Sequence, residues 1–130
     1  MICIFVSRDK EIFSSIEQAL IRNHMDVEWI DTAKDLLSLL SEPASNPPDK
    51  KVGLVIVDGN LPGENARDLI EQIIMLNPMV NCVATSALSA EDFHETFEGL
   101  GVLMQLPVKP DEQDAARLVI HLNKILGMTA

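Results

Sequence analysis

With 130 residues, 47% of them hydrophobic, the chain is long enough for one domain with a full core, and we expect residues 1–130 to form it. Lys and Arg number 10 against 20 Asp and Glu, which gives a formal net charge of −10. An acidic surface repels nucleic-acid phosphates and anionic membranes, so composition argues against direct nucleic-acid binding and against membrane association.

The two cysteines, Cys3 and Cys82, each lie inside an apolar run of sequence. We expect both to be buried free thiols of a reducing compartment, and their spacing matches no metal-binding motif. Residues 1–6 are too short and lack the basic leader for a signal peptide, and no apolar run approaches the roughly 18 residues of a membrane span. These features predict a soluble cytoplasmic protein.

The first half of the chain alternates between apolar runs and amphipathic segments. Residues 2–6 predict a strand, and Asp9 is placed to cap an amphipathic helix over residues 10–23. Residues 27–30 predict a second, short strand. Thr32 then predicts the N-cap of a second helix, whose apolar stripe is rich in leucine.

The middle of the chain contains a proline-rich segment followed by its most apolar run. Residues 43–49 include three prolines and predict an exposed loop. Residues 52–57 are apolar at nearly consecutive positions, which is typical of a strand covered on both faces in a parallel sheet. That run stops at Asp58, and glycines and a proline then turn the backbone.

The second half repeats the alternation of helix and strand. We predict strands over residues 79–84 and 102–106, and helices over residues 66–76, from Ser89 to the glycines near 99, and from about 111 to 126. Five strand–helix alternations predict a parallel sheet with right-handed crossovers and helices on both faces.

Residues that follow the strands of such a sheet gather along one edge, where open α/β folds place their ligands. The residues expected at this edge are Ser7, Arg8, Asp58, Thr85, Ser86 and Lys109. A carboxylate nucleophile beside a lysine and a hydroxyl suits phosphoryl transfer. The alternative is an Asp58–Lys109 ion pair that only holds two loops together.

The motifs Asp58-Gly-Asn-Leu-Pro62, Thr85-Ser86 and Lys109-Pro110 resemble those of the receiver domain of two-component response regulators (CheY-like). The resemblance spans the chain and implies a flavodoxin-like three-layer (βα)5 sandwich with a five-stranded parallel sheet of order 2-1-3-4-5. It implies a signal-transduction domain of a phosphorelay in which Asp58 is the phosphoacceptor. Thr85 would be the hydroxyl that follows the phosphoryl group, and Lys109 would bind the aspartate or its phosphate.

The same resemblance implies partners and an output face. A histidine kinase or phosphotransfer protein would supply the phosphoryl group, and the chain would have no activity beyond self-catalysed transfer to Asp58. A downstream protein or a second copy of the chain would dock on the face formed by the fourth helix, fifth strand and fifth helix.

The sequence departs from the family after its first strand. Ser7 and Arg8 stand where the family has the acidic pair that holds Mg²⁺ together with the phosphoacceptor. We therefore predict weak or absent Mg²⁺ binding, with Arg8 paired to Asp58 instead. Asp9 could supply a second carboxylate through a rearranged loop, but it is better used as a helix cap. Leu106 replaces the family's aromatic switch residue and has no hydroxyl to exchange.

Two functions stay open from the sequence. The first is a receiver that accepts phosphate at Asp58. The second is an atypical pseudo-receiver, a phosphorylation-independent interaction module in which Arg8 replaces the Mg²⁺ site and a cluster of Asp58, Arg8 and Lys109 is locked. An aspartate-nucleophile phosphatase is disfavoured because Asn60 occupies the position of its second acid, and the chain lacks phosphate-loop and dinucleotide-binding glycine motifs.

Overall fold

The computed structural model describes residues 1–41 and 52–126, and the predicted loop over residues 43–49 lies outside them. Strands and helices alternate as expected, with one 3-10 turn before the first α-helix. The elements are β1 (Ile2–Val6), η1 (Glu11–Phe13), α1 (Ser14–Arg22), β2 (Asp26–Ile30), α2 (Ala33–Leu40), β3 (Val52–Val57), α3 (Ala66–Leu76), β4 (Asn81–Thr85), α4 (Ala90–Thr96), β5 (Met104–Leu106) and α5 (Glu112–Leu126).

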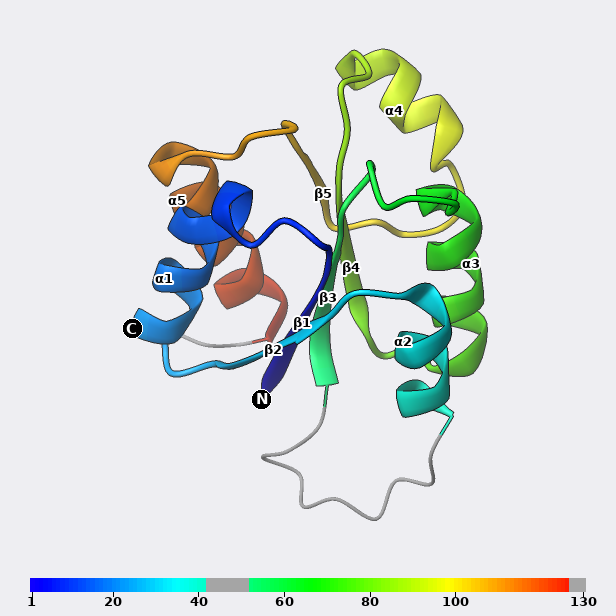
Figure 1. The fold of residues 1–130 in the computed structure, drawn as a ribbon. Coiled ribbons are helices and arrows are strands. Elements are labelled where there is room, and N and C mark those ends of the chain that lie inside the picture. The colour runs from blue at the N-terminus through cyan, green and yellow to red at the C-terminus, as the bar shows by residue number, and fades with distance from the viewer. Residues whose placement is uncertain (42–51, 127–130) are drawn as a thin grey trace.

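All five strands are parallel, and their order in the sheet is β2-β1-β3-β4-β5, as the sequence predicted. Helices α1 and α5 cover one face, and α2, α3 and α4 cover the other (Figure 1). Each face has its own apolar core, built from side chains that alternate along the strands. The result is the expected flavodoxin-like three-layer sandwich.

Strand β3 lies at the centre of the sheet, between β1 and β4. Val55 and Val57 face the core under α2, α3 and α4, whereas Leu54 and Ile56 face the core under α1 and α5. All four side chains are buried, because helices cover both faces of the strand. This explains the unbroken apolar run, and it places the residue after β3, Asp58, at the middle of the sheet edge.

Side-chain caps explain where the helices begin. Thr32, Asn65 and Ser89 each accept a hydrogen bond from the backbone N–H three residues later, at the starts of α2, α3 and α4. Helix α5 begins with a reciprocal box: Asp111 accepts from the Asp114 N–H at 3.0 Å, and Asp114 accepts from the Asp111 N–H at 2.9 Å.

Several predicted boundaries differ from the structure, most of them by one or two residues. The helix expected over residues 10–23 starts as the 3-10 turn η1, and Asp9 accepts from the Glu11 N–H rather than capping an α-helix. The strand expected from residue 79 starts at Asn81, because the N–H groups of Met79 and Val80 bond back to Asn77 in a turn. The strand expected from residue 102 starts at Met104, after a turn in which Gly101 has a φ of 66°.

An aromatic cluster closes the β2 edge of the sheet. The Trp29 ring stacks on Phe5 with 4.4 Å between centroids and an interplanar angle of 15°. Its Nε1 donates to Glu17 Oε2 on α1 at 2.8 Å. Lys10 Nζ lies over the face of the ring, 5.5 Å from its centroid, where it can form a cation–π interaction. Edge strand β2 is thereby joined to β1 and α1.

The two thiols lie in different cores. Cys3 is buried under α1 and α5, whereas Cys82 is buried under α2, α3 and α4, and both are free. This confirms the prediction of unpaired buried cysteines. None of the helices in the described part of the chain combines the length and the apolar character needed to cross a membrane.

Candidate functional site at the end of β3

Asp58 is held at the carboxyl end of β3 and is only 5% exposed. Its backbone N–H donates to Val6 O at 3.0 Å, which continues the pairing of β3 with β1 by one residue. Its carboxylate accepts two hydrogen bonds, from the Ser7 hydroxyl to Oδ2 at 2.7 Å and from the Asn60 N–H to Oδ1 at 2.8 Å. A buried carboxylate needs partners of this kind, and both oxygens have one.

The turn after Asp58 is anchored in the core. Leu61 is buried, and its N–H donates to Asp58 O at 3.1 Å. Gly63 has a φ of 74°, a conformation that glycine adopts without steric cost. The backbone then enters α3 at the Asn65 cap, so the turn that follows Asp58 leads into the start of α3.

Gly59 and Thr85 join this turn to the end of β4. The Gly59 N–H donates to Thr85 Oγ1 at 2.9 Å. A Cβ at Gly59 would lie 2.2 Å from Thr85 O, so only glycine allows this approach. Thr85 is buried, and its hydroxyl lies beside the Asp58 turn as the sequence predicted. Ser86, the next residue, instead accepts from the Leu88 N–H at 3.0 Å, on the path to α4.

Ser7 has a larger part in the site than the sequence indicated. Its N–H donates to Ile30 O at 3.0 Å, its Oγ accepts from the Asp9 N–H at 3.0 Å, and the same hydroxyl donates to Asp58. From the sequence, Ser7 was expected at this edge in place of an acidic residue, but no hydrogen bond to Asp58 was predicted for it. Its position directly after a buried strand adjacent to β3 was the available signal that a side chain there reaches Asp58.

The predicted ion pair between Arg8 and Asp58 is not present in this structure. Arg8 is exposed, and its Nε donates to Asp31 O at 3.5 Å, at the end of β2. The prediction was wrong because Ser7, not Arg8, turns inward after β1, and a guanidinium is more stable in water than in a buried site. The Asp58 carboxylate already has its two neutral donors.

Lys109 also stays apart from Asp58. It is exposed, and among the described residues the ion pairs join Arg67 to Asp68 and Glu71, and Arg117 to Asp114. Neither the Asp58–Lys109 ion pair nor a locked cluster of Asp58, Arg8 and Lys109 is therefore formed here. The residues on either side of Lys109 are less exposed: Val108 is half-buried and Pro110 is buried. The backbone therefore packs against the protein at this point, while the Lys109 side chain reaches solvent.

Leu106 is the residue that the resemblance places where an aromatic switch residue is expected. It is fully buried in the core under α1 and α5, and Leu106 O accepts from the Ser86 N–H at 2.9 Å. The preceding residue, Gln105, donates through Nε2 to Leu88 O at 2.8 Å and to Ser86 O at 3.4 Å. The loop between β4 and α4 is thus bonded to β5.

A hollow of about 200 Å³ lies between the Asp58 turn and α4. Its lining includes Gly59 and Asn60 from the turn, Ser86 from the following loop, Arg67 from α3 and Phe97 from the end of α4. Asp58 itself is not part of the lining. The hollow therefore lies between the Asp58 turn and α4, and Arg67, which is part of its lining, contacts the end of α4 at Thr96.

Solved structures share this fold. A response regulator from Thermotoga maritima is 21% identical, covers 97% of each chain and superposes with a TM-score of 0.74. The non-phosphorylated HemR receiver domain from Leptospira biflexa is 24% identical, covers 99% of this chain and 96% of its own, and gives a TM-score of 0.69. The chain has the receiver fold. An adenylate cyclase from Rhodopirellula baltica also matches, at 14% identity, with 97% and 92% coverage and a TM-score of 0.67.

The receiver fold is established by structure alone. No profile of a known protein family matches the sequence, and no curated protein matches it either. At these identities the solved structures show that the backbone is shared, while the side chains at the edge of the sheet decide what the fold does here.

The residues around Asp58 do not fit the Mg²⁺ site that the receiver fold suggests. Within residues 1–41 and 52–126, no three His, Cys, Asp or Glu side chains are grouped to hold a metal ion. Asp58 offers one carboxylate, and both of its oxygens already accept from Ser7 and Asn60. The Asp9 carboxylate is engaged with the Glu11 N–H at 3.2 Å, so it does not supply the missing ligand. A magnesium ion binds oxygen ligands with strict octahedral geometry, and this donor set is poor in them.

Proposed function

We propose that the chain is a receiver-type signalling domain whose input site is Asp58. The observation that carries the proposal is the buried Asp58 carboxylate at the end of the central strand, with the Thr85 hydroxyl bonded to the same turn. A change at this carboxylate would alter its contact with Ser7 at the end of β1 and, through the turn after β3, the contact of Gly59 with Thr85 at the end of β4. Its partner would be a histidine kinase or a phosphotransfer protein, and the chain would have no other catalytic activity.

In the first mode, Asp58 is the phosphoacceptor of a phosphorelay. A carboxylate oxygen attacks the donor's phosphorus, the donor's leaving group departs with the electrons of its bond, and an acyl phosphate forms. Thr85 would turn its hydroxyl to the new phosphoryl oxygens, and Lys109 would swing in from solvent to bind them. Thr85 ends β4 and accepts a hydrogen bond from the Gly59 N–H of the Asp58 turn, and Lys109 lies on the loop between β5 and α5, which supports these roles.

In the second mode, the domain docks partners without being phosphorylated. The Ser7–Asp58 hydrogen bond of 2.7 Å supports this mode, because the residue that reaches Asp58 from the end of β1 is a neutral hydroxyl and not a second carboxylate that would help to hold a metal. Asp58 would then be a structural acid that ties the ends of β1 and β3. Of the two modes, the second agrees better with the donors around Asp58.

Labelling with radioactive acetyl phosphate, at millimolar Mg²⁺ and in chelator, tests both modes. The second mode predicts no Mg²⁺-dependent label on the wild type, and a gain of label in the double variant Ser7→Asp/Arg8→Asp that disappears when Asp58→Asn is added. Mg²⁺-dependent labelling of the wild type that is lost in Asp58→Asn would instead establish the first mode. Isothermal titration of Mg²⁺ into the same proteins reports the metal site independently of chemistry.

Docking in either mode is proposed on the face made by α4, β5 and α5. Helix α4 and strand β5 are joined through Gln105 and the loop before α4, so they present one continuous surface. A downstream protein or a second copy of the chain is the proposed occupant, in the cytoplasm. Cross-linking with the candidate kinase and with partner proteins, with and without Glu91→Lys on exposed α4, checks this face.

A further inference from the structure

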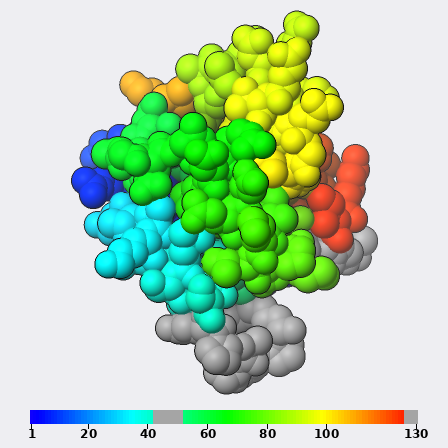
Figure 2. All heavy atoms as spheres, turned by 90° about the vertical axis from the view of Figure 1, so that its right-hand side faces the viewer, coloured from blue at the N-terminus to red at the C-terminus, as the bar shows by residue number. Residues whose placement is uncertain are grey.

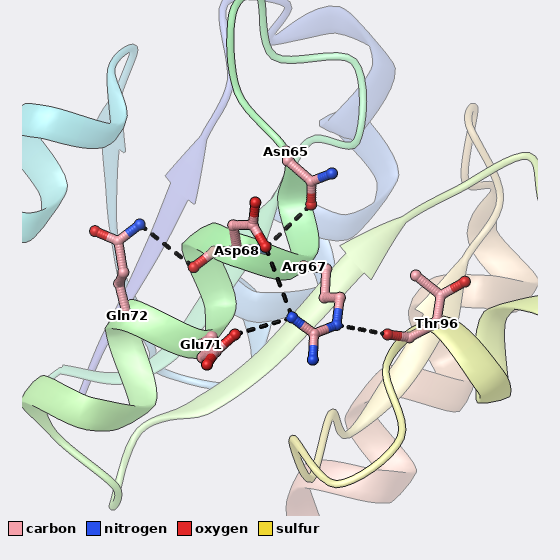
Figure 3. Close-up of polar contacts among 6 residues, drawn as sticks. All are labelled: Asn65, Arg67, Asp68, Glu71, Gln72 and Thr96. Atoms are coloured by element: carbon pink, nitrogen blue, oxygen red, sulfur yellow. Dashed lines mark hydrogen bonds and ion pairs between the residues drawn. The ribbon is translucent and has the colours of Figure 1, made fainter.

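Arg67 bridges α3 and α4. It is the second residue of α3, and its Nε donates to Thr96 O, on the last residue of α4, at 3.0 Å (Figure 3). The last carbonyls of a helix have no partner within the helix, so this donor satisfies a group that α4 cannot satisfy itself. A cation at this end also complements the helix dipole. The atoms of the two helices lie side by side on one face of the molecule (Figure 2).

The guanidinium of Arg67 is held in place from its own helix. Nη1 lies 2.9 Å from Glu71 Oε2, one turn further along α3, and 3.6 Å from Asp68 Oδ1 (Figure 3). Different nitrogens of the planar fork therefore serve α3 and α4 at the same time. A lysine keeps the charge but has no rigid fork to make both contacts together.

The other end of α4 is also bonded from outside. Gln105 Nε2 donates to Leu88 O at 2.8 Å and to Ser86 O at 3.4 Å, immediately before the Ser89 cap. Helix α4 has only seven residues, so it is too short to be stable alone. Phe93 in α4 and Phe97 at its C-cap stack on each other and are buried in the core.

We infer that Arg67 and Gln105 are two latches that set the position of α4. Arg67 is the latch that the chain connects to the Asp58 site, because the backbone after Asp58 leads through residues 59–65 into the first turn of α3. A displacement of that turn moves Arg67 and releases or tightens the carboxyl-terminal end of α4. The inference goes beyond the proposed function, since the latches act whether or not Asp58 accepts phosphate.

Amide hydrogen exchange of the whole chain tests the inference, without phosphodonor or Mg²⁺. Arg67→Ala is expected to raise exchange of the α4 amides, residues 90–97, about tenfold, the effect of losing one charge-assisted hydrogen bond. The amides of α1 and α5 are expected to stay unchanged. Arg67→Lys is expected to give much of the same increase, and Gln105→Ala to raise exchange mainly at the start of α4.

Arg22→Ala on α1 is the matched control for Arg67→Ala, because Arg22 is an exposed helical arginine far from α4 along the chain. It is expected to leave α4 unchanged. Unchanged exchange of residues 90–97 in Arg67→Ala would overturn the inference. So would an equal increase in every helix together with a lower unfolding midpoint, because Arg67 would then stabilise the fold as a whole rather than α4.

Discussion

The Ser7 hydroxyl donates to Asp58 Oδ2 at 2.7 Å, across a separation of 51 positions in the chain. Both side chains are buried, so the contact joins the ends of β1 and β3 inside the protein rather than at its surface. A buried carboxylate that loses a donor bears the full cost of its desolvation. The stability of the site therefore depends on a neutral residue that a search for charged groups overlooks.

Ser7→Ala is expected to lower the free energy of unfolding by about 1.5–3 kcal/mol, because a hydrogen bond to a charged, buried group is lost. Urea unfolding followed by circular dichroism measures the change. Ser38→Ala on α2 is the control, since Ser38 is exposed, and it is expected to change stability by less than about 0.5 kcal/mol. Equal stability of the wild type and Ser7→Ala would contradict a structural role of the Ser7–Asp58 contact.

Gly59→Ala is expected to destabilise the protein by about 1–3 kcal/mol, because its Cβ would lie 2.2 Å from Thr85 O and backbone must move. Gly53→Ala is the matched variant. A Cβ there would meet Met1 Sδ at 2.4 Å, on a flexible side chain that can turn away. Thermal unfolding of both variants should therefore show the larger loss for Gly59→Ala. A reversed order would show that the ends of β3 and β4 are not packed as tightly as described.

Stability below pH 4 is expected to depend on Asp114. Burial raises the pKa of Asp114, but hydrogen bonds from the Asp111 backbone and from Arg117 outweigh it, so the pKa lies below its ordinary value of 3.8. A carboxyl whose pKa is lower in the folded state stabilises the fold above the unfolded pKa. That contribution is lost as the pH falls from about 3.8 through the folded pKa.

Urea unfolding between pH 6 and pH 2.5 measures this dependence, and Asp114→Asn is expected to remove part of it. The variant should be less stable than the wild type at pH 6, and the difference should shrink as the acid range is entered. Asp35→Asn, at an exposed position in the first turn of α2, serves as the control. A difference in the free energy of unfolding between the wild type and Asp114→Asn that grows toward low pH would contradict a lowered pKa of Asp114 in the folded state.

Both thiols are expected to be unreactive in the folded protein. Burial raises the pKa of Cys82 to about 12 and raises the pKa of Cys3 still further, so little thiolate is present near pH 8. Reaction with a chromogenic disulfide at pH 8 should release almost no product from the native protein and two equivalents in denaturant. Cys3→Ala should release one equivalent in denaturant. Rapid reaction of the native protein would place a cysteine at the surface.

Sequence patterns predicted the fold because its determinants are local. The caps at Thr32 and Ser89 and the unbroken apolar run before Asp58 specify helix starts and a central parallel strand without knowledge of tertiary contacts. Strand ends were less accurate, since whether Met79 bonds to a neighbouring strand or back into a turn depends on Asn77. Periodicity does not encode that choice.

The site was predicted only in part, because side-chain direction decides it. The convergence of Ser7, Asp58 and Thr85 follows from the parallel sheet and was expected. Which of Ser7 and Arg8 turns inward depends on the pleat at the end of β1, and charge attraction alone gave the wrong answer. The role of Arg67 was missed because its acceptor, Thr96 O, is a backbone atom that a side-chain pattern does not reveal.

The stacking of Trp29 on Phe5 gives the protein a built-in optical probe. The chain has one tryptophan and no tyrosine, so its near-ultraviolet emission comes almost entirely from a single ring. That ring stacks on Phe5 of β1, the strand that ends one residue before Ser7. Separation of β2 from β1 would uncover the ring to water and shift its emission to the red. Spectroscopy on the unlabelled chain can therefore follow one corner of the sheet, two residues from the edge that holds Asp58.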